Sequence, residues 1–75
     1  MLYYRYMVND EKNLKKLGGK LKKARELAKL TQSQVAEKAG VHVNYYARIE
    51  RGEINLSYEN LQSITKALHI KMFDM

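Results

Sequence analysis

The sequence contains no cysteine and no proline among its 75 residues. The lack of cysteine excludes a disulfide scaffold, a thiolate zinc site and a mechanism that depends on a reactive thiol. No proline, low-complexity run or linker divides the chain, and a chain of this length has room for only one hydrophobic core. The sequence therefore predicts a single domain.

Acidic residues and long apolar runs are also scarce. Asp and Glu together number 8 against 14 Lys and Arg, and the resulting net charge of +6 favours polyanionic partners such as nucleic acid or anionic lipid. The apolar start, residues 1–8, is interrupted by Arg5 and is far shorter than the roughly 18 apolar residues of a membrane span. It also lacks the long apolar run and the cleavage site of a secretory signal, so we expect a cytoplasmic protein without a membrane segment.

Residues 1–13 show neither a helical nor a strand period. We interpret them as an N-terminal arm that precedes a domain of residues 14–75. For the tyrosines at positions 3, 4 and 6, disorder or a dimer contact is favoured over a contact with DNA bases. Met7 is an alternative start of the natural chain, and the sequence does not decide between the two.

From Leu14 onward, apolar residues recur at the spacing of an amphipathic helix. They follow one another at alternating steps of three and four, at Leu14, Leu17, Leu21, Ala24 and Ala28. Lysines occupy the opposite face. Gly18 and Gly19 should each weaken this first helix by about 1 kcal/mol relative to alanine, so the pattern does not fix where the helix starts.

Capping residues mark a second helix. Thr31 and Gln34 form a capping-box pattern, in which each side chain bonds to the backbone of the other residue, and the helix should begin near Gln32. Gly40 should end it, because glycine takes the left-handed conformation without a Cβ penalty.

Two further helices follow on short connections. The third is expected over residues 43–51 with Gly52 as its stop signal, and Ser57 should cap the fourth. The core positions of the fourth are Leu61, Ile64, Thr65 and Leu68. No stretch alternates with period two, so the sequence predicts an all-α fold, a compact bundle of four to five helices in which residues 70–75 add one more turn.

Residues 32–51 have the pattern of two short helices that meet steeply across a turn. The small Ala36 lies where the two axes would approach, and Gly40 lies where the backbone reverses. The apolar positions that place both helices over one core are Val35, Ala39, Val41, Tyr46 and Ile49. The outer face of the second of these helices would remain free, and a helix presented in this way fits the DNA major groove.

This stretch, TQSQVAEKAGVHVNYYARIERG, resembles the XRE-type helix-turn-helix family of Cro and the phage repressors. The preceding LGGKLKKARELAKL resembles the first helix of that family, and SYENLQSITKALHI extends the likeness, which covers residues 17–72. The small, turn-glycine, apolar and IERG positions all keep their relative spacing, which makes the set specific. The resemblance implies a lambda-repressor-like DNA-binding domain with its helix-turn-helix at about residues 32–51.

The resemblance also implies which residues contact DNA. Val43, Asn44 and Arg48 match the family's base-reading positions, and His42 lies beside them. The expected phosphate contacts are Gln32, which matches the family's phosphate-binding glutamine, and with it Tyr45, Lys22, Lys23 and Arg51. Arg25 and Glu50 match a partly buried ion pair that orients the third helix without touching DNA.

Four positions depart from the family pattern. Lys29 replaces a glycine that is usual before the second helix, His69 replaces one after the fourth, and Leu56 stands where proline is common. We therefore expect these connections to differ locally. Val43 replaces a reader that is usually polar, which points to apolar contacts or to DNA shape as part of the recognition.

As a function, the resemblance implies a transcriptional regulator, most often a repressor, that binds a palindromic operator in double-stranded DNA as a homodimer. The dimer contacts are expected at Ile70, Met72 and Phe73, where the tail is more apolar than a free end needs. Two alternatives stay open. One is a restriction-modification controller that also activates, and the other is an antitoxin or similar module whose main partner is a protein, such as a toxin or RNA polymerase.

No enzymatic, metal or cofactor site is expected. His42 and His69 lie in different helical regions without thiol or carboxylate partners. The residues 18–20, Gly-Gly-Lys, lack the preceding strand, the glycine spacing and the Ser/Thr of a phosphate loop, and the sequence has no Ser/His/Asp set. A membrane-surface module built on the basic first helix is the alternative from another class, while RNA binding is disfavoured because the tyrosines form no stacking platform.

Overall fold

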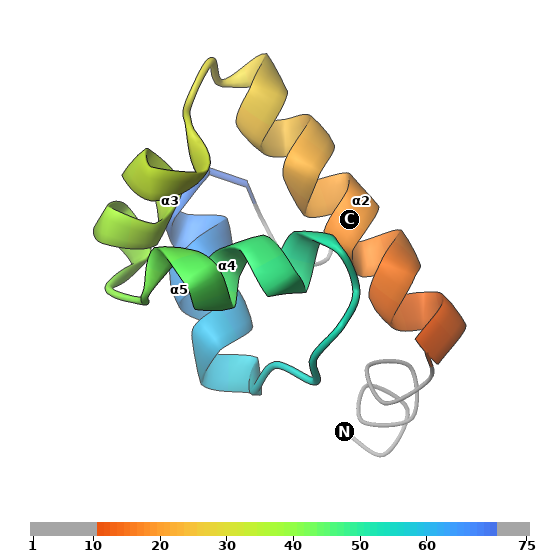
Figure 1. Cartoon of the computed structure of the whole chain (residues 1–75). Helices are drawn as coiled ribbons and strands as arrows, with labels where there is room; N and C mark the ends of the chain where they lie inside the picture. The colour runs from red at the N-terminus through yellow and green to blue at the C-terminus, as the bar shows by residue number, and fades with distance from the viewer. Residues whose placement is uncertain (1–10, 71–75) are drawn as a thin grey trace.

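The computed structural model describes residues 11–70, and within this range the chain forms helices and no strand. Figure 1 shows their arrangement, in the order α2 (Glu11–Leu27), α3 (Gln32–Ala39), α4 (Val43–Glu50) and α5 (Tyr58–Ala67). The predicted all-α fold is confirmed. Residues 1–10 of the predicted arm and residues 71–75 of the tail lie outside the described range.

The first helix differs from its prediction at both ends. α2 begins at Glu11, so residues 11–13, which were assigned to the arm, are helical. Residues 11–13 are polar and show no apolar period, so the sequence pattern did not include them in the helix. Their turn supplies backbone carbonyl acceptors for the amides of the next turn, beside the buried Leu14. α2 ends at Leu27, and Ala28 is therefore exposed in the turn that follows, although the pattern had placed it on the core face.

The predicted start signals are present with good hydrogen-bond geometry. The Gln34 amide donates to Thr31 Oγ1 at 3.0 Å, and the Thr31 amide donates to Gln34 Oε1 at 2.8 Å, which completes the capping box of α3. Ser57 caps α5 by accepting from the Asn60 amide at 3.1 Å. Both helices therefore begin where local sequence predicted.

Each of the four helices within residues 11–70 ends in the same hydrogen-bonded turn, the Schellman motif, in which one residue takes a left-handed conformation. Glycine fills that position after α3 and α4, at Gly40 with φ 74° and at Gly52 with φ 73°. After α2 and α5 the position holds Lys29 with φ 60° and His69 with φ 59°. The two departures from glycine therefore fall on backbone that favours glycine, where a side chain with Cβ is strained by about 1–2 kcal/mol.

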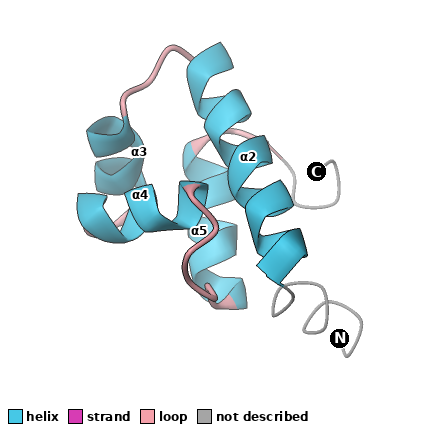
Figure 2. Ribbon diagram, turned by 45° about the vertical axis from the view of Figure 1, so that its right-hand side comes forward, coloured by secondary structure: helices cyan, strands magenta, loops and turns pink. Residues whose placement is uncertain are grey.

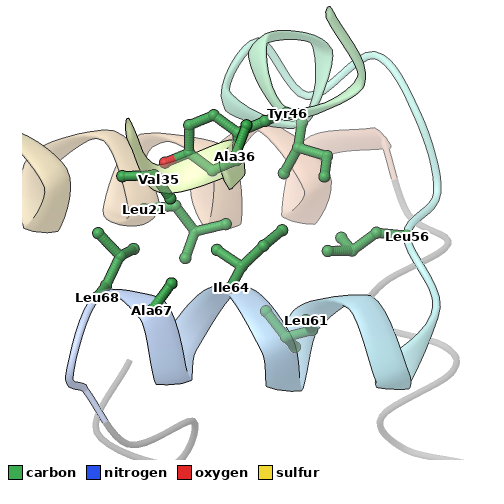
Figure 3. Close-up of a cluster of buried hydrophobic side chains, with 10 residues drawn as sticks. Leu21, Val35, Ala36, Tyr46, Leu56, Leu61, Ile64, Ala67 and Leu68 are labelled. Atoms are coloured by element: carbon green, nitrogen blue, oxygen red, sulfur yellow. The ribbon is translucent and has the colours of Figure 1, made fainter. Parts of the chain in front are cut away.

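The core lies between α5 and the three preceding helices. Figure 3 shows Ile64, Ala67 and Leu68 of α5 facing Leu21 of α2 and Val35 of α3. The largest fully buried side chains are Tyr46, Leu21, Ile49, Ile64 and Val35. Burial of each of these contributes roughly 1.5–3 kcal/mol, so this small core holds all four helices in one unit.

Leu56, which stands where the family commonly has proline, is also a core residue. Its side chain is 4% exposed and extends into the cluster from the loop before α5. At this position, where the family commonly has proline, the chain therefore has an apolar side chain that packs in the core. Among residues 11–70 no helix has both the length and the apolar character needed to cross a membrane.

Candidate nucleic-acid interface

The turn between α3 and α4 brings the two helices together at a steep angle (Figure 2). The Gly40 amide donates to the Glu37 carbonyl at 3.2 Å, and the Val41 amide donates to the Ala36 carbonyl at 3.0 Å. Ala36 is 2% exposed, and a small side chain is needed where two backbones approach closely. Residues 32–51 thus form the helix-turn-helix that the sequence predicted.

His42 has a structural role that the sequence analysis did not assign. It is the N-cap of α4, and its Nδ1 atom accepts a hydrogen bond from the Asn44 amide at 3.1 Å. Histidine is not among the residues preferred at this position, so no capping pattern marked it. Because Nδ1 is an acceptor here, the ring carries its hydrogen on Nε2, and that atom points away from the cap as a possible donor.

Three of the four expected base contacts are exposed, two on the outer face of α4 and one at its N-cap. His42, Asn44 and Arg48 are exposed, whereas Val43 is half-buried and packs against the core. Tyr46 and Ile49, on the opposite face of the helix, are 0% and 2% exposed and anchor it from inside. The polar groups of α4 therefore project from a helix that cannot rotate without exposing its own core residues.

A buried ion pair fixes the end of α4. Arg25 Nε lies 2.7 Å from Glu50 Oε2, and the two side chains are 13% and 3% exposed. A second contact joins Arg25 Nη2 to Glu50 Oε1 at 3.2 Å, and Arg25 Nη1 also donates to the Leu30 carbonyl at 2.9 Å. This geometry is bidentate, which is the arrangement in which arginine and a carboxylate bind most strongly.

Gln32 joins the same network. Its Nε2 atom donates to Glu50 Oε1 at 2.9 Å, so one carboxylate at the end of α4 receives bonds from both α2 and α3. Burial acts to raise the pKa of Glu50, but the hydrogen bonds from Arg25 and Gln32 outweigh it and hold that pKa below its ordinary value. The carboxylate therefore stays ionised and holds α4 in place against α2 and α3.

The Tyr46 hydroxyl is buried beside this network. Burial, reinforced by the Glu50 carboxylate, raises the pKa of Tyr46 far above its ordinary value, so the phenol stays neutral. The hydroxyl has no hydrogen-bond partner among the residues that the structure describes.

The residues expected to contact phosphate differ in exposure. Lys22, Lys23 and Arg51 are exposed, and Gln32 and Tyr45 are half-buried. One amide hydrogen of Gln32 is used by Glu50, which leaves the second for an outside acceptor. The Tyr45 hydroxyl accepts from Asn60 Nδ2 at 2.8 Å, so its own hydrogen remains available to donate.

A surface carboxylate that the sequence analysis did not single out contacts both arginines of this region. Glu53 Oε2 accepts from Arg51 Nε at 2.8 Å, and Glu53 Oε1 lies 3.5 Å from Arg48 Nε. The hydrogen bond to Glu53 raises the pKa of Arg51, and the same bond lowers the pKa of Glu53. The only local signal for Glu53 was its place directly after the stop glycine of the helix.

Over residues 11–70 no group of three or more His, Asp or Glu side chains is placed to hold a metal ion. The described surface instead contains a rigid helix with exposed hydrogen-bonding groups, and cationic side chains are exposed on the same domain.

The family model described as helix-turn-helix matches residues 21–74. The chain belongs to this family. The resemblance to XRE-type repressors that the sequence carried is thereby confirmed.

Two relatives of this helix-turn-helix protein can be named. The immunity repressor protein of Bacillus phage phi105 is 41% identical over 56 residues, which make up 75% of this chain and 39% of the repressor. This helix-turn-helix protein thus spans well under half of that relative's length. The crystal structure of the restriction-modification controller protein C.AhdI from Aeromonas hydrophila matches with a TM-score of 0.77 at 32% identity, covering 79% of this chain and 89% of the controller.

Proposed function

We propose that this protein is a DNA-binding transcriptional regulator that inserts α4 into the major groove of double-stranded DNA. The observation that carries this proposal is the exposure of Asn44 and Arg48 on the side of α4 opposite to the buried Tyr46 and Ile49, with His42 exposed at the N-cap. A rigidly presented helix of this kind fits the major groove, where each base pair offers a distinct pattern of donors and acceptors. No chemical step is needed for this function.

The side chains of α4 suit particular bases. Arg48 can donate two hydrogen bonds to guanine O6 and N7, and Asn44 can bridge N6 and N7 of adenine. The exposed part of Val43 is suited to a thymine methyl group, and His42 can donate from Nε2. These assignments give α4 the base readout in the proposed complex.

Residues around α4 are proposed to hold the DNA backbone. Gln32 and Tyr45 each keep one donor hydrogen that the protein does not use, and Lys22, Lys23 and Arg51 supply positive charge. Such contacts set position and affinity and carry no sequence information of their own. A net charge of +6 supports a strong contribution from the backbone.

The proposed assembly is a homodimer on a palindromic operator. Two copies of α4 would lie about 34 Å apart, one turn of DNA, so that each reads a half-site in the major groove. Ile70 is half-buried and packs against the core, while Met72 and Phe73, the other proposed dimer contacts, lie outside the described residues. Sedimentation of a Phe73→Glu variant tests this surface, and an unchanged dimer would remove it from the proposal.

The proposed sense of regulation is repression. It is supported by the name of the phage relative, an immunity repressor protein. The proposed place of action is the cytoplasm, where a prokaryotic or phage operator is found. The partner in this proposal is DNA, and no further protein is required for binding.

Selection of bound sites from a random duplex library tests the whole proposal. We expect a palindrome whose half-sites are separated by one helical turn. Enrichment of a single unpaired site would contradict the homodimer but keep the DNA-binding role. Recovery of no common site, or tighter binding to anionic vesicles than to duplex DNA at physiological salt, would overturn the proposed function.

A further inference from the structure

Hydrogen bonds in the turn that follows α4 hold the backbone of residue 53 in place. The Gly52 amide donates to the Ile49 carbonyl at 3.0 Å, and the Glu53 amide donates to the Arg48 carbonyl at 3.0 Å. These two bonds are those of a Schellman motif, which needs the left-handed conformation found at Gly52. The backbone of Glu53 is therefore tied directly to that of Arg48.

The turn is also held from outside. A Cβ atom on Gly52 would lie 2.7 Å from the Cα atom of Lys15, which shows how closely α2 packs on this turn. Since both the hydrogen bonds and the neighbouring helix restrict it, the backbone at Glu53 has little freedom. The fold therefore sets where the Glu53 side chain starts, within reach of Arg48 and Arg51.

The Glu53 carboxylate lies between two arginines with proposed DNA contacts. It binds Arg51 with both oxygens, at 2.8 Å to Nε and 3.3 Å to Nη2, and it lies 3.5 Å from Arg48 Nε. The side chains of Arg48, Arg51 and Glu53 are 53%, 57% and 45% exposed, so all three face solvent. A negative charge thus lies between the two arginines at the end of α4.

We propose that Glu53 is a specificity-determining residue, which holds Arg48 and Arg51 back from unselective contacts with DNA phosphates. The proposal rests on the proposed DNA-binding function. Binding to random duplex comes almost entirely from phosphate contacts, so a carboxylate that repels phosphates and occupies Arg51 weakens this binding directly. On the operator, a bidentate contact of Arg48 with guanine gives a gain that random sequence does not offer.

The weakness of the exposed ion pairs is part of the argument. Because pairs of this exposure contribute little, a well-placed guanine and phosphate can replace Glu53 as the partners of Arg48 and Arg51. A random sequence offers phosphate alone, and there Arg51 remains with the carboxylate. Glu53 therefore increases the difference in affinity between operator and random duplex, although it lowers the affinity for both.

Glu53→Gln tests the proposal, with Glu37→Gln on α3 as the matched control. Both changes raise the net charge by the same amount, Glu37 is exposed, and its carboxylate has no contact with Arg48 or Arg51. Operator and random duplex are titrated with each protein between 50 and 200 mM salt. For random duplex, one additional phosphate contact steepens the slope of log affinity against log salt by about 0.9, so affinity falls about threefold more over this range in Glu53→Gln than in the wild type.

Each outcome decides a different question. We expect the ratio of operator affinity to random-duplex affinity to be lower in Glu53→Gln than in the wild type, with a deficit about three times larger at 50 mM than at 200 mM salt, and Glu37→Gln like the wild type. An unchanged ratio and slope in Glu53→Gln, or an equal change in both variants, would overturn the role of Glu53 while the wild type still selects its operator. Absence of selective duplex binding by the wild type would overturn the proposed function together with this inference.

Discussion

Gly18 of α2 lies directly against the backbone of Ile49 at the end of α4. A Cβ atom in place of its hydrogen would collide with the carbonyl oxygen of Ile49 and would lie 2.8 Å from the carbonyl carbon of Glu50. A Cβ atom placed in the same way on the next residue, Gly19, meets no neighbour within 4 Å. Two adjacent glycines of one helix therefore serve different purposes, and only the first is required by packing.

This contrast gives the first prediction. Gly18→Ala forces α2 away from α4 and should lower the free energy of unfolding by about 1–3 kcal/mol, the range for overpacking. Gly19→Ala should raise it by roughly 1 kcal/mol, because alanine is the better helix former and meets no neighbour. Urea denaturation of the two variants measures both effects. Equal changes in the two would show that the close approach at Gly18 does not limit the packing.

A second prediction concerns pH. The pKa of Glu50 is lowered in the folded state, so its ionisation contributes stability above the unfolded pKa of about 4.3. That contribution should be lost as the pH falls through the folded pKa, which lies lower still. Urea denaturation of wild type and Glu50→Gln from pH 7 to 2 measures it.

Glu50→Gln leaves Arg25 charged and without its bidentate partner in a mostly buried place. It should therefore be less stable than the wild type at pH 7, by about 3–5 kcal/mol, and the difference should shrink toward pH 2. A constant difference across the range would contradict the assignment of this pH dependence to Glu50.

A third prediction concerns the left-handed residue after α2. Lys29→Gly should stabilise the protein by about 0.5–1 kcal/mol, because glycine adopts φ 60° without Cβ strain and this gain exceeds its larger loss of entropy on folding. Lys29→Ala is the matched control, since it removes the charged side chain and keeps the Cβ atom. Thermal unfolding compares the two, and a gain in both variants would assign the effect to the charge instead of the backbone.

A fourth prediction separates base contacts from phosphate contacts. Arg48→Ala should weaken operator binding by about 1–3 kcal/mol and relax the preference at one base pair of each half-site. Lys22→Ala should weaken all sequences alike and reduce the salt slope by about 0.9. Titrations against the operator, a single-base variant and random duplex measure both, and identical profiles would contradict the separate roles.

The parts of the fold that depend on local sequence were predictable from the residues themselves. Thr31 and Gln34 lie three residues apart and bond to each other's backbone, and Gly40 takes the left-handed turn without help from other elements. Such features involve only neighbours along the chain, so their patterns carry enough information. The bounds of α3 followed from these features, and the start of α5 followed from the Ser57 cap in the same way.

The features that depend on contacts between distant residues were not predictable in the same way. Gly18 was interpreted as a weak point of the helix, because nothing in α2 itself shows that α4 crosses there. The carboxylate of Glu53 meets two arginines only after the turn at Gly52 has formed. The cap at His42 was missed because the residue type is uncommon at that position.

One of the residues predicted to contact bases lies in a different environment from the one expected. Val43 was placed on the outer face, and the structure shows it half-buried against the core. It is the first residue of the helix, where a β-branched apolar side chain gains more from contact with the core than from water. Only a part of its surface is left for a thymine methyl group.

Glu50 receives hydrogen bonds from Arg25 in α2 and from Gln32 in α3, although it belongs to α4. The tilt of α4 is consequently decided at an interior junction, away from the exposed side chains that are proposed to contact DNA. Substitutions inside the protein that shift this junction by a fraction of an ångström would re-aim all the proposed base contacts at once. Under the proposed function, new operator preferences can therefore arise from changes that leave the exposed side chains of α4 intact.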